Sequence, residues 1–270
     1  MNTTNSKLNA TVISNEQVAD GLFFLRVLPD LGVPDFLPGQ YVALGLPNEE
    51  KPEKIDKRAC STGSPPSTKE YLEFYIAAVP DGLLSRRLEK ASPNQKLFCA
   101  KKVVGTFTLS SIPEGADVFF VSTGTGIAPF ISMLRSGDIW KKVGKVTIVH
   151  GVRYESDLAY KEELESLEST YADRFSYRCT VSRPKDGWKG DSGYVQQFFI
   201  NQSLESANSS EKSDSSEACK QITALNASND HFFLCGNPAM VTELSEWLKE
   251  QGFKEHSRKS PGNLHLENYW

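Results

Sequence analysis

The stretch DKRACSTGS, residues 56–64, places a cysteine beside a serine and two residues after an arginine. Arg58 would lower the pKa of the Cys60 thiol and so favour a reactive thiolate. No histidine that would act as a base stands near it in the sequence. Three roles are therefore open for Cys60: a reactive thiol, a core residue, or a replacement for a residue with another task.

A glycine-rich turn follows an apolar run in FFVSTGTGIAPF, residues 119–130. Such a turn between a buried strand and a helix presents backbone N–H groups and the helix dipole to a phosphate. Gly124 and Gly126 allow a close backbone approach, although Ala128-Pro129 takes the place of the third glycine in the usual pattern. A tight turn without a ligand is the alternative interpretation.

A second small turn ends the apolar run of FLCGNPAM, residues 233–240. Doubly wound sheets bind ligands at the carboxyl ends of their strands, and Cys235 and Gly236 would line that crevice. A buried cysteine that ends a core strand is the simpler alternative.

Two further stretches carry charge or aromatic rings. In VSRPKDGWKG, residues 181–190, Arg183, Lys185 and Lys189 offer cations to a phosphate, unless the loop is a solvated charged one. The chain ends on Tyr269 and Trp270, which either pack on the protein or stack on a flat aromatic ligand.

The elements that must position these residues change in character near residue 110. Before it, short apolar stretches at 9–30, 39–47, 70–80 and 95–109 alternate with Gly and Pro turns, which predicts a β-barrel or sandwich with one short helix at 81–91. After it, strand and helix patterns alternate strictly, which predicts a parallel doubly wound sheet. We expect domains at 1–110 and 113–270, with a Ser/Glu-rich surface insertion at 203–220.

Composition narrows the function classes. The net charge of −4 gives no sign of a nucleic-acid binder, and neither a signal peptide nor a membrane span is expected. Five cysteines without a CxxC pair favour a reducing, cytoplasmic setting, and the scattered histidines predict no metal site.

Several stretches then occur in one order: RACS, FYIAAVPDGLLS, GTGIAP, HGVRY, VSR, LCGNPAMV and a terminal ENYW. With this order and these separations, the chain from about residue 8 to its end resembles the ferredoxin/flavodoxin–NADP⁺ reductases, in particular the bacterial type. The resemblance implies an antiparallel six-stranded FAD-binding barrel followed by a Rossmann-like parallel-sheet NADP-binding domain.

The resemblance also implies two cofactor sites and three catalytic residues. The FAD site would comprise Arg58, Ala59, Cys60, Ser61, Tyr75, Leu83, Leu84, Ser85, Thr125, Tyr269 and Trp270. The NADP(H) site would comprise Gly124, Gly126, Val152, Arg153, Ser182, Arg183, Phe233, Leu234, Cys235, Gly236 and Asn237. Ser61 would hydrogen-bond near flavin N5, Cys235 would lie by the hydride path, and Glu267 would handle a proton.

Two positions depart from the family pattern. Cys60 stands where a tyrosine normally packs on the flavin, and Tyr194 stands where the bacterial members have a second arginine for the 2′-phosphate. Lys185 or Lys189 would replace that charge. The NADPH preference then rests mainly on Arg183.

The implied activity is hydride transfer from NADPH to FAD N5, followed by single-electron transfer to ferredoxin or flavodoxin by a monomer that binds neither nucleic acid nor membrane. Because such acceptors are acidic, we expect a basic rim that includes Arg86, Arg87, Lys101 and Lys102. One alternative is an NAD(P)H-dependent reductase that serves an oxygenase or another acceptor, although no CxxxxCxxC of a [2Fe–2S] domain is present. The other is a flavin-binding sensor without turnover, for which a second nucleotide site would be superfluous.

Overall fold

The computed structural model describes residues 7–80, 82–200 and 225–269. The predicted insertion at 203–220 and Trp270 lie outside these ranges. The chain forms two compact units: Met1–Ser111 with Thr125–Lys142, and Ile112–Gly124 with Val143–Trp270. The predicted division at residues 110–113 follows the sequence pattern alone and stays a prediction.

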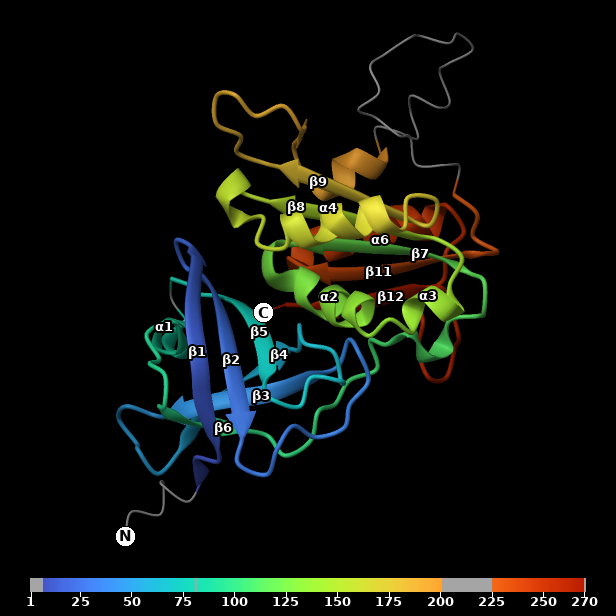
Figure 1. Ribbon diagram of the computed structural model, residues 1–270. Helices are drawn as coiled ribbons and strands as arrows, with labels where there is room; N and C mark the ends of the chain where they lie inside the picture. Colours follow the sequence, from blue (N-terminus) through green and yellow to red (C-terminus); the bar gives the residue numbers. More distant parts are fainter. Residues whose placement is uncertain (1–6, 81, 201–224, 270) are drawn as a thin grey trace, which may run out of the picture. The chain divides into compact units, whose positions relative to one another are not determined.

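The first unit is a six-stranded antiparallel sheet with strand order β4-β3-β6-β1-β2-β5 (Figure 1). Its edge strands β4 and β5 touch each other, so the sheet curls into the predicted barrel. The strands are β1 Ala10–Ala19, β2 Leu22–Pro29, β3 Tyr41–Pro47, β4 Ile55–Ser61, β5 Leu72–Ala77 and β6 Lys96–Cys99. Helices α1 Leu83–Glu89, α2 Ala128–Arg135 and α3 Ile139–Lys142 and the short turn η2 Leu109–Ser111 belong to the same unit.

Alternating burial along the strands builds the barrel core. In β2 the side chains of Phe23, Leu25 and Val27 are fully buried, while their neighbours are partly exposed. Helix α1 adds Leu84 and Leu88 to this core, which explains why a single short helix follows β5. The predicted β-strands and the helix at 81–91 are confirmed.

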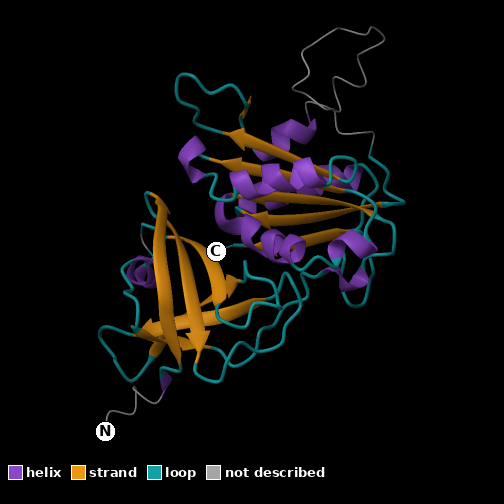
Figure 2. Ribbon diagram, in the orientation of Figure 1, coloured by secondary structure: helices purple, strands orange, loops and turns teal. Residues whose placement is uncertain are grey.

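The second unit is built on a six-stranded sheet with strand order β10-β9-β8-β7-β11-β12, in which every paired strand runs parallel (Figure 2). Its strands are β7 Asp117–Thr123, β8 Val146–Val152, β9 Phe175–Val181, β10 Asp191–Ser192, β11 Asp230–Gly236 and β12 Leu264–Asn268. The turns and helices of this unit are η4 Glu155–Asp157, α4 Lys161–Thr170, the helical residues 195–200 and α6 Pro238–Glu250. The turn η3 Gly124–Ile127 follows β7, and its last three residues belong to the first unit. The predicted doubly wound sheet is confirmed.

The two faces of this sheet carry different residues. One face packs Phe119, Val121, Phe232 and Leu234 against α6 and residues 195–200. Because side chains alternate along a strand, Phe120, Ser122, Phe233 and Cys235 point to the opposite face. Both sets are buried.

One helix begins later than its sequence pattern suggests. The apolar spacing predicts a helix from Leu158, but α4 begins at Lys161. The Tyr154 N–H donates to the Asp157 carboxylate at 3.1 Å and the Leu158 N–H to the Glu155 carbonyl at 3.2 Å, so a separate turn occupies this stretch.

Within the described residues, no helix has the length and apolar character needed to cross a bilayer.

Candidate functional site

The end of strand β4 presents an exposed cation next to a fixed backbone. Arg58 and Ala59 are exposed, whereas Ser61 is buried. The Thr62 N–H and hydroxyl both donate to the Gln40 carbonyl, at 3.2 and 3.1 Å. The guanidinium of Arg58 is therefore accessible to an anion, and the strand end behind it is held in place.

Cys60 packs against the barrel core and lies opposite Val42 of β3. Burial raises the pKa of its thiol to about 12, which outweighs the lowering effect of Arg58. The thiol is therefore protonated at neutral pH, which argues against a reactive thiolate among the three roles considered above.

The start of helix α1 offers backbone donors. Gly82 precedes the helix without a side-chain cap, so the N–H groups of the first turn have no partner within the helix. A Cβ at Gly82 would meet the Ser85 Oγ at 2.6 Å, which explains the glycine in this turn. Leu83 is largely exposed, whereas Leu84 lies in the core. These donors and Arg58 fit the oxygens of a diphosphate.

Tyr75 is buried on β5 and contacts Phe24 of β2, with ring centroids 5.1 Å apart. Thr125 and Gly126 are buried in the glycine turn η3. The predicted FAD residues of the first unit thus divide into exposed groups near Arg58 and α1 and buried groups that support them.

In the second unit, strands β7 and β11 meet closely at their carboxyl ends. The Asn237 N–H donates to the Thr123 Oγ1 at 2.8 Å. Gly236 has φ +135°, and a Cβ there would lie 2.3 Å from the Thr123 Oγ1 and 2.8 Å from its carbonyl oxygen. Gly124 has φ +51° with no atom within 4 Å of an added Cβ, so its backbone is open to a ligand.

His150 of β8 holds this glycine turn. Its Nε2 lies 2.9 Å from the Gly124 carbonyl, and since a carbonyl only accepts, this nitrogen carries the proton. Burial lowers the pKa of His150 to about 4, so the ring is neutral at physiological pH. No pattern in the sequence predicts this contact, because His150 lies within an ordinary apolar strand.

Cys235 and Glu267 lie side by side in register on β11 and β12, with Sγ and Oε1 4.0 Å apart. Ser122 of β7 lies in register on the other side of Cys235. Burial, and then the Glu267 charge, raises the pKa of the Cys235 thiol well above its usual value, while a hydrogen bond to Tyr269 lowers it. The structure therefore brings two of the three predicted catalytic residues together; Ser61 belongs to the other unit.

The two residues before Cys235 point in opposite directions. The Phe233 ring stacks on His265 at 4.2 Å between centroids. Leu234 packs in the core cluster on the α6 face. Leu234 can therefore contribute only its backbone to a nucleotide site.

The loops after β8 and β9 are joined by backbone hydrogen bonds. The Ser182 N–H and hydroxyl donate to the Val152 carbonyl at 2.9 and 3.2 Å, and the Arg183 N–H donates to the Arg153 carbonyl at 2.9 Å. Arg183 is fully exposed, and its hydrogen bond to Tyr154 raises the pKa of its guanidinium.

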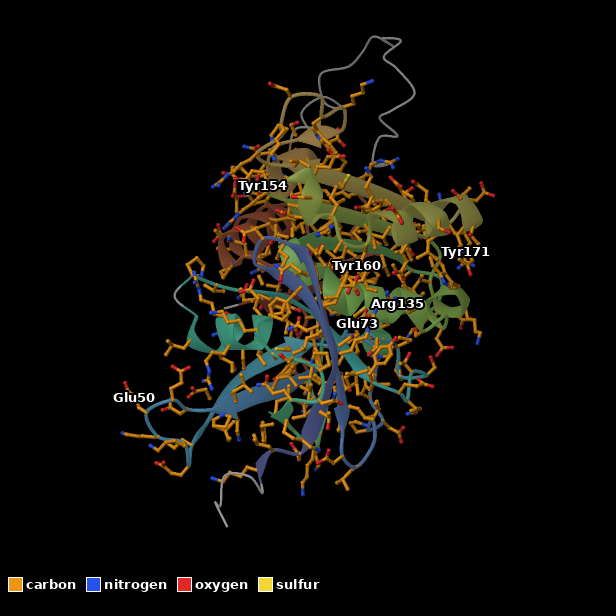
Figure 3. The ribbon with its side chains drawn as sticks, turned by 60° about the vertical axis from the view of Figure 1, so that its left-hand side comes forward. Glu50, Glu73, Arg135, Tyr154, Tyr160 and Tyr171 are labelled. Atoms are coloured by element: carbon orange, nitrogen blue, oxygen red, sulfur yellow. The ribbon has the colours of Figure 1, made fainter. Side chains whose placement is uncertain are left out.

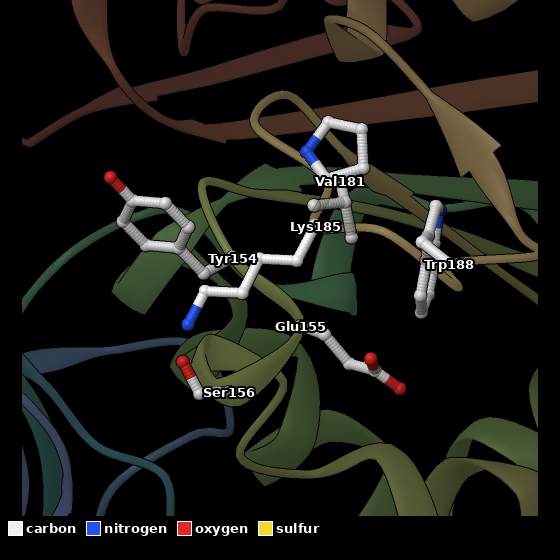
Figure 4. Close-up of a pocket in the computed structure, with 7 residues that line it drawn as sticks. Tyr154, Glu155, Ser156, Val181, Lys185 and Trp188 are labelled. Carbon is white, nitrogen blue, oxygen red and sulfur yellow. The ribbon is translucent and has the colours of Figure 1, made fainter.

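A pocket of about 370 Å³ opens between these loops (Figure 4). It is lined by Tyr154, Glu155, Ser156, Val181, Pro184, Lys185 and Trp188. Trp188 is held by its Nε1–H, which donates to the Asp191 carbonyl at 3.0 Å. Of the two lysines considered for the missing arginine, Lys185 lines this pocket and Lys189 does not. Tyr154 and Trp188 were not among the predicted site residues, although they lie in the stretches HGVRY and VSRPKDGWKG.

Comparison with known proteins agrees with this architecture. A family model for the oxidoreductase NAD-binding domain matches residues 120–246. The flavodoxin/ferredoxin–NADP reductases of Buchnera aphidicola subsp. Baizongia pistaciae and Escherichia coli K12 are each 31% identical to the chain; the matches cover 98% and 93% of this chain and 100% and 94% of the relatives. In fold, the chain is similar to a ferredoxin NADP+ reductase from Neisseria gonorrhoeae with bound FAD and NADP, with a TM-score of 0.80 and 24% identity over 96% of this chain and 97% of that chain.

Proposed function

Because the chain belongs to the flavodoxin/ferredoxin–NADP reductase family, we propose that it holds FAD and passes electrons between NADPH and ferredoxin or flavodoxin. The site observation that carries the proposal is the register of Cys235 with Glu267 beside the open Gly124 backbone. This edge of the parallel sheet is where doubly wound folds bind nucleotides.

The donors of the barrel unit fit FAD. The exposed Arg58 and the first turn of α1 provide a cation and several N–H groups, the chemistry that a flavin dinucleotide's diphosphate requires. When bound, flavin supplies the conversion between a two-electron hydride donor and one-electron acceptors. Ser61 and Thr125, which are predicted to lie on the flavin side of the site, are both buried. They would therefore bring few ordered water molecules into contact with the flavin.

The nucleotide-binding unit would orient the nicotinamide. Gly124 leaves its backbone open at the end of β7, the buried Gly236 lets β11 pack closely on Thr123, and the neutral Cys235 thiol adds no charge that would oppose hydride transfer. The Glu267 carboxylate is the proton-handling group of this unit. Proximity of donor and acceptor in such a site is worth up to roughly 7–11 kcal/mol of the barrier.

The proposed function is tested by mixing the purified FAD-loaded protein with NADPH under anaerobic conditions and following flavin absorbance. We expect rapid bleaching by NADPH, slower bleaching by NADH, and recovery of absorbance when oxidised ferredoxin or flavodoxin is added. Absence of bleaching with either nucleotide would leave only the interpretation as a sensor without turnover.

We expect the pocket beside Arg183 to set the preference for NADPH. Replacing Arg183 or Lys185 by alanine should raise the KM for NADPH about tenfold, because a charge-assisted contact to the 2′-phosphate is lost, and should leave NADH unaffected. Lys189→Ala is the matched control, since Lys189 is in the same loop but outside the pocket lining. Equal losses with NADPH and NADH would contradict a role in 2′-phosphate recognition.

The acceptor surface needs one correction to the predicted basic rim. The Arg87 guanidinium pairs with Glu49 at 3.2 Å and with Asp56 at 3.3 Å, so its charge is largely neutralised within the barrel unit. Arg86, Lys101 and Lys102 are exposed. We therefore expect these three residues to form the basic surface that contacts an acidic one-electron carrier.

A further inference from the structure

Glu73 is a buried carboxylate in the barrel wall that the electron-transfer proposal does not use. It lies on β5 with 3% of its surface exposed and is paired on both oxygens. Arg26 of β2 lies 2.9 Å from Oε2, and Arg135 of α2 lies 2.7 Å from Oε1. Glu73 and Arg135 are labelled in Figure 3. Because burying a carboxylate is costly even when it is paired, this arrangement calls for an explanation beyond stability.

The backbone of Glu73 is bonded to the segment that follows Ser61. The Gly63 N–H donates to the Glu73 carbonyl at 2.8 Å, and the Glu73 N–H donates to the Ser64 Oγ at 3.0 Å. These bonds connect the start of β5 to the turn after β4. The backbone of residue 73 therefore holds the turn that directly follows Ser61 at the end of β4.

Helix α2 is also hydrogen-bonded to this turn, at Gly63 and Ser64. The Arg135 Nη1 donates to the Gly63 carbonyl at 3.2 Å as well as to Glu73, and the Ser132 hydroxyl donates to the Ser64 carbonyl at 2.7 Å. Ser132 and Arg135 are three residues apart and so lie on one face of the helix. Both carbonyls of the turn are thus bonded to α2.

The same helix begins at the glycine turn. The segment Gly124–Ile127 leads directly into α2, and residues Thr125–Lys142 belong to the barrel unit. Ser61 and Thr125, two of the residues predicted to form the FAD site, are therefore attached to the two ends of one hydrogen-bonded clamp. We define the clamp as Glu73, Ser132 and Arg135.

We propose that Arg135 is a positioning residue for hydride transfer, which acts with Glu73 and Ser132 to fix the separation of Ser61 and Thr125. The inference rests on the proposed function, since it takes both residues to contact FAD. Arg26 is the comparison residue. It pairs with the same carboxylate, but within the part of the chain that the structure describes it makes no hydrogen bond to the turn at residues 63–64.

The test compares Arg135→Gln with Arg26→Gln in the FAD-loaded full chain. Each variant removes one ion pair from Glu73, and the two arginine side chains are similarly exposed, 28% and 32%. We expect Tm to fall in both, and somewhat further in Arg135→Gln, because this variant also loses the hydrogen bond to the Gly63 carbonyl. The rate of flavin reduction at saturating NADPH should fall about tenfold in Arg135→Gln alone, because even a small misplacement of the reacting groups raises the barrier to hydride transfer.

A second readout does not depend on turnover. The visible circular dichroism of bound flavin, measured without NADPH, should change in Arg135→Gln and stay as in the parent in Arg26→Gln. If Arg135→Gln does not fold, Ser132→Ala removes only the bond to Ser64 and should lower the rate about threefold with the same spectral change.

Equal rate losses in Arg135→Gln and Arg26→Gln, or unchanged rate and spectrum in Arg135→Gln, would overturn the clamp. If NADPH fails to bleach the parent protein, the proposed function fails instead. The spectral comparison then still decides whether Arg135 positions the flavin site.

Discussion

Replacing Gly236 by alanine is expected to lower the free energy of unfolding by about 2–5 kcal/mol and to reduce flavin reduction by NADPH at least about 100-fold. Gly236 has φ +135°, a conformation that L side chains rarely adopt. The added Cβ would also lie 2.9 Å from the Thr123 nitrogen and 2.8 Å from its carbonyl oxygen, and backbone atoms cannot move aside as a flexible side chain can. The strand ends would separate and displace Cys235 and Asn237. Urea unfolding and anaerobic bleaching measure the two effects.

Gly32→Ala is the control for this variant. Gly32 also has a positive φ, +81°, but no atom lies within 4 Å of an added Cβ. Only the backbone penalty of about 1–2 kcal/mol should remain, with normal flavin reduction. If both variants lost the same stability and the same activity, close packing of Gly236 on Thr123 would not be the cause.

The fold could be predicted wherever a local pattern matched the final element. Strand β4, in which three of seven residues are charged, and the two-residue strand β10 show no such pattern and were not identified. Apart from β12, the other strands of both units follow alternating or continuous apolar runs, and these were identified from the sequence. Strand β12 was not, because LHLEN is short and partly polar and becomes a strand only by pairing with β11, more than thirty residues earlier along the chain. Similarly, Leu158 fits a helical spacing, but the bond from the Tyr154 N–H to Asp157 holds a separate turn before α4.

The site was predictable to the extent that it consists of short motifs. The glycine turn and LCGNP each mark a strand end, and the sheet register places Cys235 beside Glu267. Long-range side-chain pairs left no such mark. Arg135 bonds Glu73 across 62 residues of sequence, and His150 bonds the Gly124 carbonyl across 26. Arg135 lies in a segment whose composition suggests only a helix end, and His150 lies in one that suggests only a buried strand.

Acidification is expected to destabilise the protein through its buried histidines. Burial lowers the pKa of His150 to about 4, and burial together with His256 and His231 lowers that of His265 to about 3. The unfolded chain therefore takes up protons first as the pH falls below about 6.5. The stability that these neutral rings provide is complete above that pH and is lost as the pH falls towards 4, on the order of 3 kcal/mol for each ring.

His265→Phe isolates one of these contributions. The His265 ring stacks on Phe233 with an interplanar angle of 7°, and its Nε2 is buried without a hydrogen-bond partner, so a phenyl ring keeps the packing and loses no bond at that atom. The unfolding free energies of the parent and the variant should depend on pH in the same way near pH 7. Below about pH 6.5 the two curves should diverge, with the variant losing less stability than the parent. Contributions from groups other than His265 are common to both proteins and cancel in the difference. Parallel curves down to pH 4.5 would show that His265 does not resist protonation in the folded state.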